Sequence, residues 1–222
     1  MLQNRKRKQR MVRSWASAGK GHACFVVGAG TSLNNLSDEQ IEKIQESFTI
    51  CVNRAYQIIK PDILLYQDCQ FFFENKKYVK ENPDNCIMLT RDITSIVELP
   101  HLYTFKLITG KFSKPNRLPY LQGSGNSGAL AFQLAMHLGF NPIILLGMDC
   151  CYDEEGNTSF FGKNKFHTNR TLINCRLGLA YIKLCSKMVK IYSLSTNNFF
   201  KQSSFLKVMK KLKKVKKKFK LI

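Results

Sequence analysis

Several common signatures are missing from this 222-residue sequence. None of its eight cysteines has CxxC spacing, and no two of its four histidines lie at metal-ligand spacing, so we expect no bound metal. No run reaches the roughly 18 apolar residues that a membrane-spanning helix needs. The basic first residues are not followed by an apolar segment before the first expected strand, so we expect no secretory signal peptide. A hydrophobic fraction of 44% indicates a globular protein.

Acidic residues are absent from both ends of the chain. Residues 1–13 hold six of the 35 Lys and Arg, and residues 201–222 hold ten lysines, with no acid in either stretch. The body between them has 19 bases against 15 acids, although the formal net charge of the chain is +20. Charge concentrated at the two ends is informative about the partners that the ends contact, and less so about the chemistry of the body. We expect a basic N-terminal arm at 1–20, one domain at 21–200 and a lysine-rich tail at 201–222.

The cysteines lie mostly inside apolar runs, such as ACFVVG at 23–28. This placement is typical of reduced core thiols in a cytoplasmic protein. Redox activity of the adjacent Cys150 and Cys151 is the alternative, but adjacent cysteines rarely bridge each other.

Apolar runs alternate with helical patterns along the body. Helices are expected after the Ser37 cap, over 126–139 and over 171–189, and residues 110–120 are expected to be a loop. The expected strands share a β-rich or continuously apolar composition and cover 23–33, 48–56, 61–68, 86–92, 102–108, 141–149 and 190–195. This alternation predicts an α/β fold with a mostly parallel sheet and helices on both faces.

Polar residues or glycines lie at or just past the carboxyl ends of four of these expected strands. Gly28–Gly30, Asn53 and Asp68 belong to the first three, and Asp149 and Tyr152 to the strand at 141–149. In open parallel sheets, ligands bind beyond the carboxyl ends of the strands. The sequence therefore predicts a ligand site at this edge, where the Asn53 amide suits a base edge or a sugar hydroxyl.

The first expected strand breaks into a glycine turn, GAGTSL at 28–33. Gly28 and Gly30 would let the backbone approach a phosphate, and Thr31 and Ser32 would add hydroxyl donors. The turn matches neither GxGxxG nor a Walker loop, and an ordinary tight turn is an equal alternative.

A second turn of small residues, SGNSGA at 124–129, leads into a helix. The free amides and the positive dipole end near Ser127 and Gly128 would favour a phosphate or carboxylate. The alternative is an ordinary helix start whose small residues allow close packing.

His167 lies in an expected loop, where a near-neutral pKa would suit a general base, although a solvated histidine is the commoner case. The acids at 153–155, together with Asp149, are a conceivable Mg²⁺ site, but DEEGN is more typical of a polar turn.

The last residues form an amphipathic pattern. Val208, Leu212, Val215, Phe219 and Ile222 fall on one stripe of a helix whose other faces are lysine. We expect residues 205–222 to contact an anionic membrane surface, at the inner face of the membrane. Nucleic acid is a less favoured partner, and a solvated tail is the remaining alternative.

The order of these motifs resembles a known family. GAGTSL, VNRA followed by KPD, SGNSGALA, LGFNPIILLGMDCCY and IYSLS resemble domain-of-unknown-function family 115, also called MptE-like. That family is similar to the family 42 sialyltransferases and the Maf flagellin glycosyltransferases. The resemblance covers residues 23–195 and implies one Rossmann-like, GT-A-type domain.

The resemblance also implies roles for particular residues. In the sialyltransferase branch, a tyrosine matching Tyr152 stabilises the leaving phosphate, and a histidine matching His167 is the general base. Asp149 is expected to orient loop amides or a sugar hydroxyl. The positions that would hold the cytidine nucleotide match Gly28, Gly30, Ser32, Asn53, Ser127 and Gly128.

Three hypotheses follow from the resemblance. The first is a glycosyltransferase that moves a sugar, of sialic-acid type, from a CMP-linked donor to a glycan or protein hydroxyl without a cofactor. The second is an MptE-like diphosphokinase that uses Mg²⁺ and depends on Asp149 or Asp68. The third is a nucleotide-binding module without catalysis. The donor sugar, the acceptor and the oligomeric state are not determined by the sequence.

Overall fold

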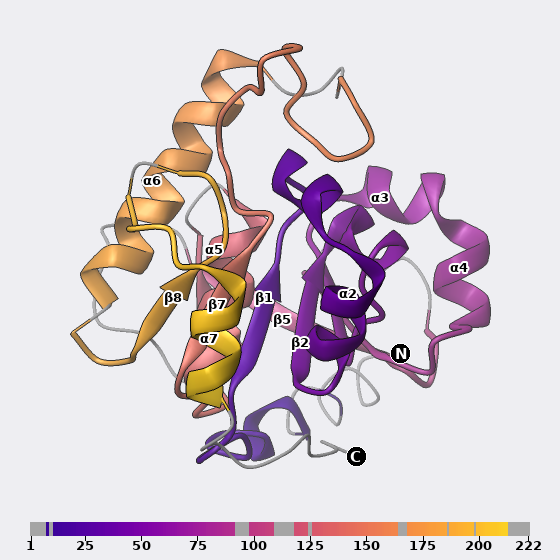
Figure 1. Ribbon diagram of the computed structural model, residues 1–222. Helices are drawn as coiled ribbons and strands as arrows, with labels where there is room; N and C mark the ends of the chain where they lie inside the picture. The colour runs from indigo at the N-terminus through magenta and orange to yellow at the C-terminus, as the bar shows by residue number, and fades with distance from the viewer. Residues whose placement is uncertain are drawn as a thin grey trace.

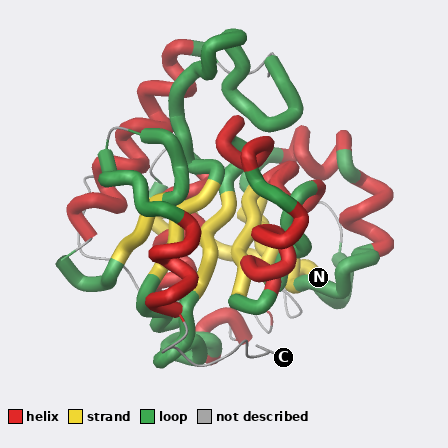
Figure 2. Tube along the Cα trace, in the orientation of Figure 1, coloured by secondary structure: helices red, strands yellow, loops and turns green. Residues whose placement is uncertain are grey.

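A computed structural model describes residues 8, 11–91, 98–108, 118–123, 126–163, 168–185, 187–197 and 199–212. Its centre is one sheet that lies between two layers of helices (Figures 1 and 2).

Eight strands form this sheet in the order β6-β5-β4-β3-β2-β1-β7-β8, and each neighbouring pair is parallel. The predicted α/β fold with a parallel sheet is confirmed. The strands are β1 (Cys24–Val27), β2 (Phe48–Val52), β3 (Ile63–Tyr66), β4 (Ile87–Arg91), β5 (Leu102–Ile108), β6 (Tyr120–Gln122), β7 (Ile143–Leu146) and β8 (Ile191–Ser193).

Both faces of the sheet are covered, which explains why its central strands are continuously apolar. Cys24 and Val26 of β1 face one core, whereas Phe25 and Val27 face the other. The first core is closed by α5 (Ser127–His137) and α6 (Asn169–Cys185). The second is closed by helices on the opposite face, which are α2 (Asp38–Gln45), α3 (Cys69–Glu74), α4 (Lys76–Glu81) and α7 (Phe205–Leu212).

The chain reverses its direction of winding at β1. From β1 it adds β2 to β6 on one side, and it then returns to place β7 and β8 on the other side. The connections that leave β1 and β7 therefore lead toward opposite ends of the sheet. Such a switch point is where open α/β sheets bind ligands.

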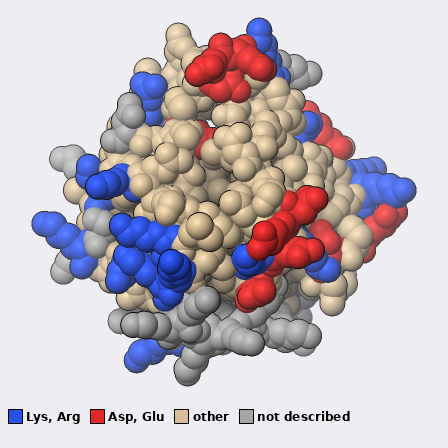
Figure 3. Space-filling view, in the orientation of Figure 1, with Lys and Arg blue, Asp and Glu red and all other residues tan. Residues whose placement is uncertain are grey.

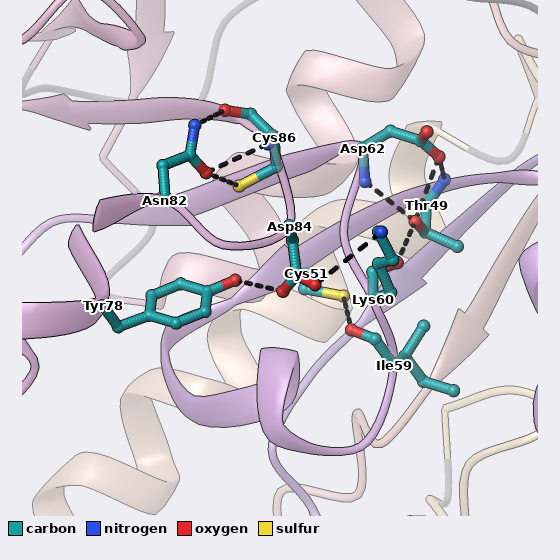
Figure 4. Close-up of polar contacts among 9 residues, drawn as sticks. All are labelled: Thr49, Cys51, Ile59, Lys60, Asp62, Tyr78, Asn82, Asp84 and Cys86. Carbon is teal, nitrogen blue, oxygen red and sulfur yellow. Dashed lines mark hydrogen bonds and ion pairs between the residues drawn. The ribbon is translucent and has the colours of Figure 1, made fainter. Parts of the chain in front are cut away.

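The opposite, amino-terminal edge of the sheet is closed by paired polar groups (Figure 4). The Thr49 amide donates to Asp62 Oδ2 over 2.8 Å, and the Tyr78 hydroxyl donates to Asp84 Oδ2 over 2.6 Å. Asn82 bonds both the amide and the carbonyl of Cys86. These hydrogen bonds hold the loops at this edge in place.

All three helices expected from the sequence form, and the one expected over 171–189 is α6. The other two begin with side-chain caps. Ser37 and Gln40 make a reciprocal capping box at α2. Asn126 caps α5, and Gly139 follows this helix with a φ of +82°.

Some elements were not predicted. Helices α3 and α4 have only six residues each, and β6 has three, so each is too short to show a period. Two 3₁₀ turns, η1 (Thr31–Asn35) and η2 (Asn53–Gln57), follow β1 and β2 at the edge where the site was expected.

Part of the predicted N-terminal arm belongs to the packed body. Val12 and Trp15 are buried in the first core, and the Trp15 ring lies edge-on to Tyr103 with centroids 5.0 Å apart. The amide of Gly19 donates to the carbonyl of Leu138. The boundary expected at residue 20 therefore falls inside packed structure.

The described part of the predicted tail is also packed on the body. In α7, Val208 is fully buried and Leu212 is 9% exposed, because both close the second core. The apolar stripe expected to face a membrane is, over 205–212, covered by the protein itself. Its continuation at Val215, Phe219 and Ile222 lies outside the described residues.

No helix in the described ranges is long and apolar enough to cross a membrane. Contact of the tail with an anionic membrane surface remains a prediction, as does the inner-membrane location.

Candidate functional site

A cleft of about 720 Å³ lies at the carboxyl edge of the sheet. The space-filling view shows a hollow in this part of the molecule, with mostly uncharged side chains around it (Figure 3). The lining residues come from the loops after β1, β2, β3 and β7, from α3, from the start of α5, from residues 158–163 and from α6. Residues predicted at the expected strand ends and at the helix start meet here, namely Gly28, Gly30, Asn53, Asp68, Ser127, Gly128 and Asp149.

The glycines let two loops touch at the switch point. A Cβ on Gly28 would lie 2.2 Å from the carbonyl oxygen of Gly147, which itself has a φ of +63°. The Gly30 amide donates to that same carbonyl over 2.8 Å. Contact between the β1 and β7 loops therefore explains Gly28 without a phosphate.

Asp149 ties three loops together. Its carboxylate is 2% exposed, and its two oxygens accept the amides of Ser32 over 2.8 Å and Thr196 over 2.9 Å. A Cβ on Gly30 would lie 2.3 Å from Asp149 Oδ2, so the glycine leaves room for the carboxylate. Both oxygens are used by backbone amides, which makes Asp149 an organiser of the cleft loops.

The start of α5 is already capped by a side chain that the sequence analysis did not single out. Asn126 Oδ1 accepts the amides of Gly128 over 2.6 Å and Ala129 over 3.2 Å. Asn126 Nδ2 donates to the carbonyl of Cys175 and so joins α5 to α6. Two of the amides expected to bind an anion are therefore satisfied, while Ser127 lines the cleft. An asparagine directly before a helix start was the available signal.

Among the described residues, two that line the cleft have a buried side-chain oxygen without a hydrogen-bond partner, namely Asn53 Oδ1 and Ser159 Oγ. Asn53 is the one that the sequence places at a strand end. It begins η2 directly after β2 and has a φ of +50°, which is rare for a residue with a side chain. Its Oδ1 is buried and accepts no hydrogen bond from any residue that the structure describes. A buried unpaired acceptor is costly, so its presence in a cleft indicates a group that supplies the missing donor.

Charged residues of both signs line the cleft. Arg54 donates to Glu74 Oε2 over 2.8 Å and lies over the Phe161 ring at 4.9 Å from the centroid. Gln70 occupies the other oxygen of Glu74. Burial raises the pKa of the Asp68 carboxyl, and the positive charge of Arg91 opposes that rise.

Other predicted site residues lie apart from this group. Tyr152 is 46% exposed, is not among the lining residues, and its hydroxyl donates to Asn169 Oδ1 over 3.4 Å. Thr31 and Ser32 lie in η1 and do not line the cleft, although the Ser32 amide holds Asp149. His167 lies outside the described residues. Among the residues that are described, no group of three or more His, Cys, Asp and Glu is placed to hold a metal ion.

Comparisons with known proteins agree with this architecture. A family model described as 6-hydroxymethylpterin diphosphokinase MptE-like matches residues 2–155. No curated protein matches the chain.

Solved structures of two proteins share the fold. One is a Maf glycosyltransferase from Magnetospirillum magneticum AMB-1, with a TM-score of 0.59 and 14% identity over 96% of this chain. The chain spans only 42% of that protein. The other is the sialyltransferase CstII from Campylobacter jejuni with cytidine-5′-monophosphate, with a TM-score of 0.54 and 16% identity over 83% of this chain and 86% of that one. Another structure of CstII holds CMP-3FNeuAc and gives a TM-score of 0.52, with 13% identity over 83% of this chain and 87% of that chain.

Proposed function

We propose that this chain, which belongs to the 6-hydroxymethylpterin diphosphokinase MptE-like family, works as a glycosyltransferase-like enzyme. It would take a sugar of sialic-acid type from a CMP-linked donor and transfer it to a glycan or protein hydroxyl. The shared fold with CstII, which was solved with CMP and with a CMP-sugar analogue, supports this choice of donor.

The unpaired Asn53 carbonyl is the observation that carries the proposal. It is a buried acceptor at the end of β2, and the cleft around it is large enough for a nucleotide. A cytosine amino group or a ribose hydroxyl would supply the donor that the protein lacks there. Asn53 would thus select the nucleoside and hold it at the switch point.

Phosphate recognition would use groups on the facing walls. The Ser127 hydroxyl and the Lys163 ammonium both belong to residues that line the cleft, and both are donors suited to phosphate oxygens. Asp149 would act as a positioning residue, because its two amide contacts fix the loops around the donor.

The catalytic roles remain predictions. His167 would remove the proton from the acceptor hydroxyl, and Tyr152 would stabilise the departing phosphate. Substituting His167 by alanine should leave nucleotide binding intact and abolish transfer. A nucleotide-binding module without catalysis would be indifferent to that change.

The description of the family supports a second candidate function, a Mg²⁺-dependent diphosphokinase. That chemistry needs carboxylates free to bind the metal. In the cleft, Asp149 and Glu74 are both engaged through their two oxygens, so Asp68 would have to bear this role. The geometry favours glycosyl transfer.

A calorimetric titration tests the proposal. CMP, UDP and ATP are each titrated into the full chain with and without Mg²⁺. The proposal predicts CMP binding that does not depend on Mg²⁺ and that weakens in Asn53→Ala. Mg²⁺-dependent ATP binding would contradict it and support the diphosphokinase, and binding of none of the three would refute both.

A further inference from the structure

The last part of the chain carries positive charge only. All 15 acidic residues lie within residues 1–155, whereas residues 156–222 hold 17 Lys and Arg and no acid. The described parts of this stretch include α6, the edge strand β8 and α7. Below the red group at the top of Figure 3, the left edge of the molecule, where Figure 1 places α6, bears blue side chains and no red ones. These elements therefore bring positive charge to one end of the sheet without an acidic residue of their own.

Lysines from both faces of the sheet meet at this end. Lys190 Nζ lies 5.7 Å from the centroid of the Tyr192 ring on β8, and Lys211 Nζ of α7 lies 4.8 Å from the same centroid. β8 is the terminal strand of the sheet on this side. The basic charge that follows α6 is therefore adjacent to the basic charge of α7.

The outer face of α6 is apolar and exposed. Four large apolar side chains recur there at steps of 4, 7 and 4, and we call them the apolar stripe: Ile173, Leu177, Leu184 and Met188. They are 55%, 51%, 70% and 61% exposed, and they are four of the eight exposed large apolar side chains in the described part of the chain. The opposite side of the helix is already used, because Leu179 and Ile182 are buried in the first core. A contiguous exposed apolar surface of this kind indicates an interaction site.

Basic side chains run along one flank of the apolar stripe. Arg176, Lys183 and Lys187 recur at steps of 7 and 4, and all three are exposed. An apolar stripe beside a row of Lys and Arg is the pattern that binds at the surface of an anionic membrane. A second copy of the chain docked on the same stripe would bring two basic rows together, which like-charge repulsion opposes. Nucleic acid would pair with the basic row through its phosphates and would leave the apolar stripe without a partner.

We propose that the outer face of α6 binds the surface of an anionic membrane, with the apolar stripe inserted among the lipid headgroups and the basic row next to lipid phosphates. This surface differs from the stripe through Val208 and Leu212, which the protein itself covers. The first turns of α6 also supply Thr171, Leu172 and Cys175 to the cleft. A membrane bound along α6 would therefore lie against the outer side of a cleft wall. The surface does not depend on what the cleft binds, so this proposal can fail or hold independently of the proposed transferase activity.

Vesicle sedimentation tests the apolar stripe. The full chain is mixed with vesicles of phosphatidylcholine alone, or of phosphatidylcholine and phosphatidylserine at about three to one, and the bound fraction is measured. We expect binding to the anionic vesicles, weakened by about tenfold or more in the double variant Leu177→Gln/Leu184→Gln. Phe73→Gln is a matched control, because Phe73 is 64% exposed on α3 and faces away from the first core. Binding of the double variant at the wild-type level would assign the membrane contact to another part of the chain and overturn the proposal.

The basic row is tested in the same assay. Arg176→Gln/Lys187→Gln should weaken binding to the anionic vesicles by about tenfold or more, whereas Lys76→Gln/Lys77→Gln on α4 should bind like the wild type. Equal losses in the two variants would mean that net charge alone drives binding, which would contradict a role for α6. Equal binding to neutral and anionic vesicles would contradict the electrostatic part of the proposal.

Fluorescence quenching shows which surface meets the lipid. The single tryptophan, Trp15, is buried, so a tryptophan introduced by Leu184→Trp can be followed against it. Brominated lipid in the anionic vesicles should quench Leu184→Trp and should leave Phe73→Trp unchanged. Absence of quenching at position 184 in a vesicle-bound chain would refute insertion of α6. A dimer in the absence of vesicles that Leu177→Gln/Leu184→Gln dissociates would overturn the proposal in favour of a second copy.

Discussion

Replacing Asn53 by glycine should make the ligand-free protein more stable while it loses its nucleotide. The unpaired Oδ1 is buried, and a buried acceptor without a partner costs about 1–3 kcal/mol. Glycine removes that group. It also accepts the φ of +50° without the steric cost of about 1 kcal/mol that a side chain meets there.

Glycine also has a destabilising effect, because it loses more conformational entropy on folding, which costs about 0.5–1 kcal/mol. This cost roughly cancels the steric relief at the backbone. The net expectation is a gain of about 1 kcal/mol in the free energy of unfolding, or about 2–4 °C in Tm for a chain of this size.

Asn85 offers a matched control, since it has the same φ of +50° but is exposed and does not line the cleft. Asn85→Gly has the same steric relief and the same entropy cost, but it removes no buried side-chain carbonyl. The free energy of unfolding of this variant should therefore be nearly that of the wild type. The difference between the two variants isolates the unpaired group.

The assay combines thermal unfolding with calorimetry. Asn53→Gly should weaken CMP binding by about 10- to 100-fold, as expected for one lost hydrogen bond that leaves the ligand's donor unpaired. Asn85→Gly should bind like the wild type. A less stable Asn53→Gly that binds CMP normally would refute the reasoning and make Asn53 a structural residue.

Three further outcomes are expected. Gly30→Ala should cost on the order of 3 kcal/mol in urea unfolding, because its Cβ would lie 2.3 Å from Asp149 Oδ2; a neutral result would mean that the loops are not locked. Val208→Ala should lower the free energy of unfolding by about 2 kcal/mol, because Val208 is fully buried. Leu206→Ala, at a site that is 70% exposed, should change it by less than about 0.5 kcal/mol. Equal effects of the two variants would contradict packing of α7 on the body. Because the Asp68 pKa is raised by burial, its contribution to stability is present below the ordinary value of 3.8 and is lost as the pH rises through the folded pKa. Asp68→Asn should therefore flatten the fall in stability just above that pH in acid-range denaturant titrations, and an unchanged pH profile would contradict the shift.

The sheet could be predicted because continuous apolar runs and the turns between them are local properties. The runs at 48–56 and 141–149 became β2 and β7, with pairing partners on both sides. Periodicity cannot say what covers an apolar face. The stripe through Val208 and Leu212 is typical of a helix on a membrane surface, but these two residues pack on the protein's own second core.

The cleft could be placed because parallel strands end at one edge, which brought Asn53, Asp68 and Asp149 together. Side-chain direction could not be predicted in the same way. Cys150 has a left-handed backbone, and two residues later Tyr152 is half exposed and bonded to Asn169.

The most direct test of the account is turnover. The full chain is incubated with CMP-linked sialic acid and a mixture of glycan acceptors in one reaction, and with ATP, Mg²⁺ and 6-hydroxymethylpterin in another. Released CMP and AMP are then quantified. The account predicts CMP release that falls in Asn53→Gly and in His167→Ala, without AMP release. AMP release from the second reaction, with no CMP from the first, would contradict it.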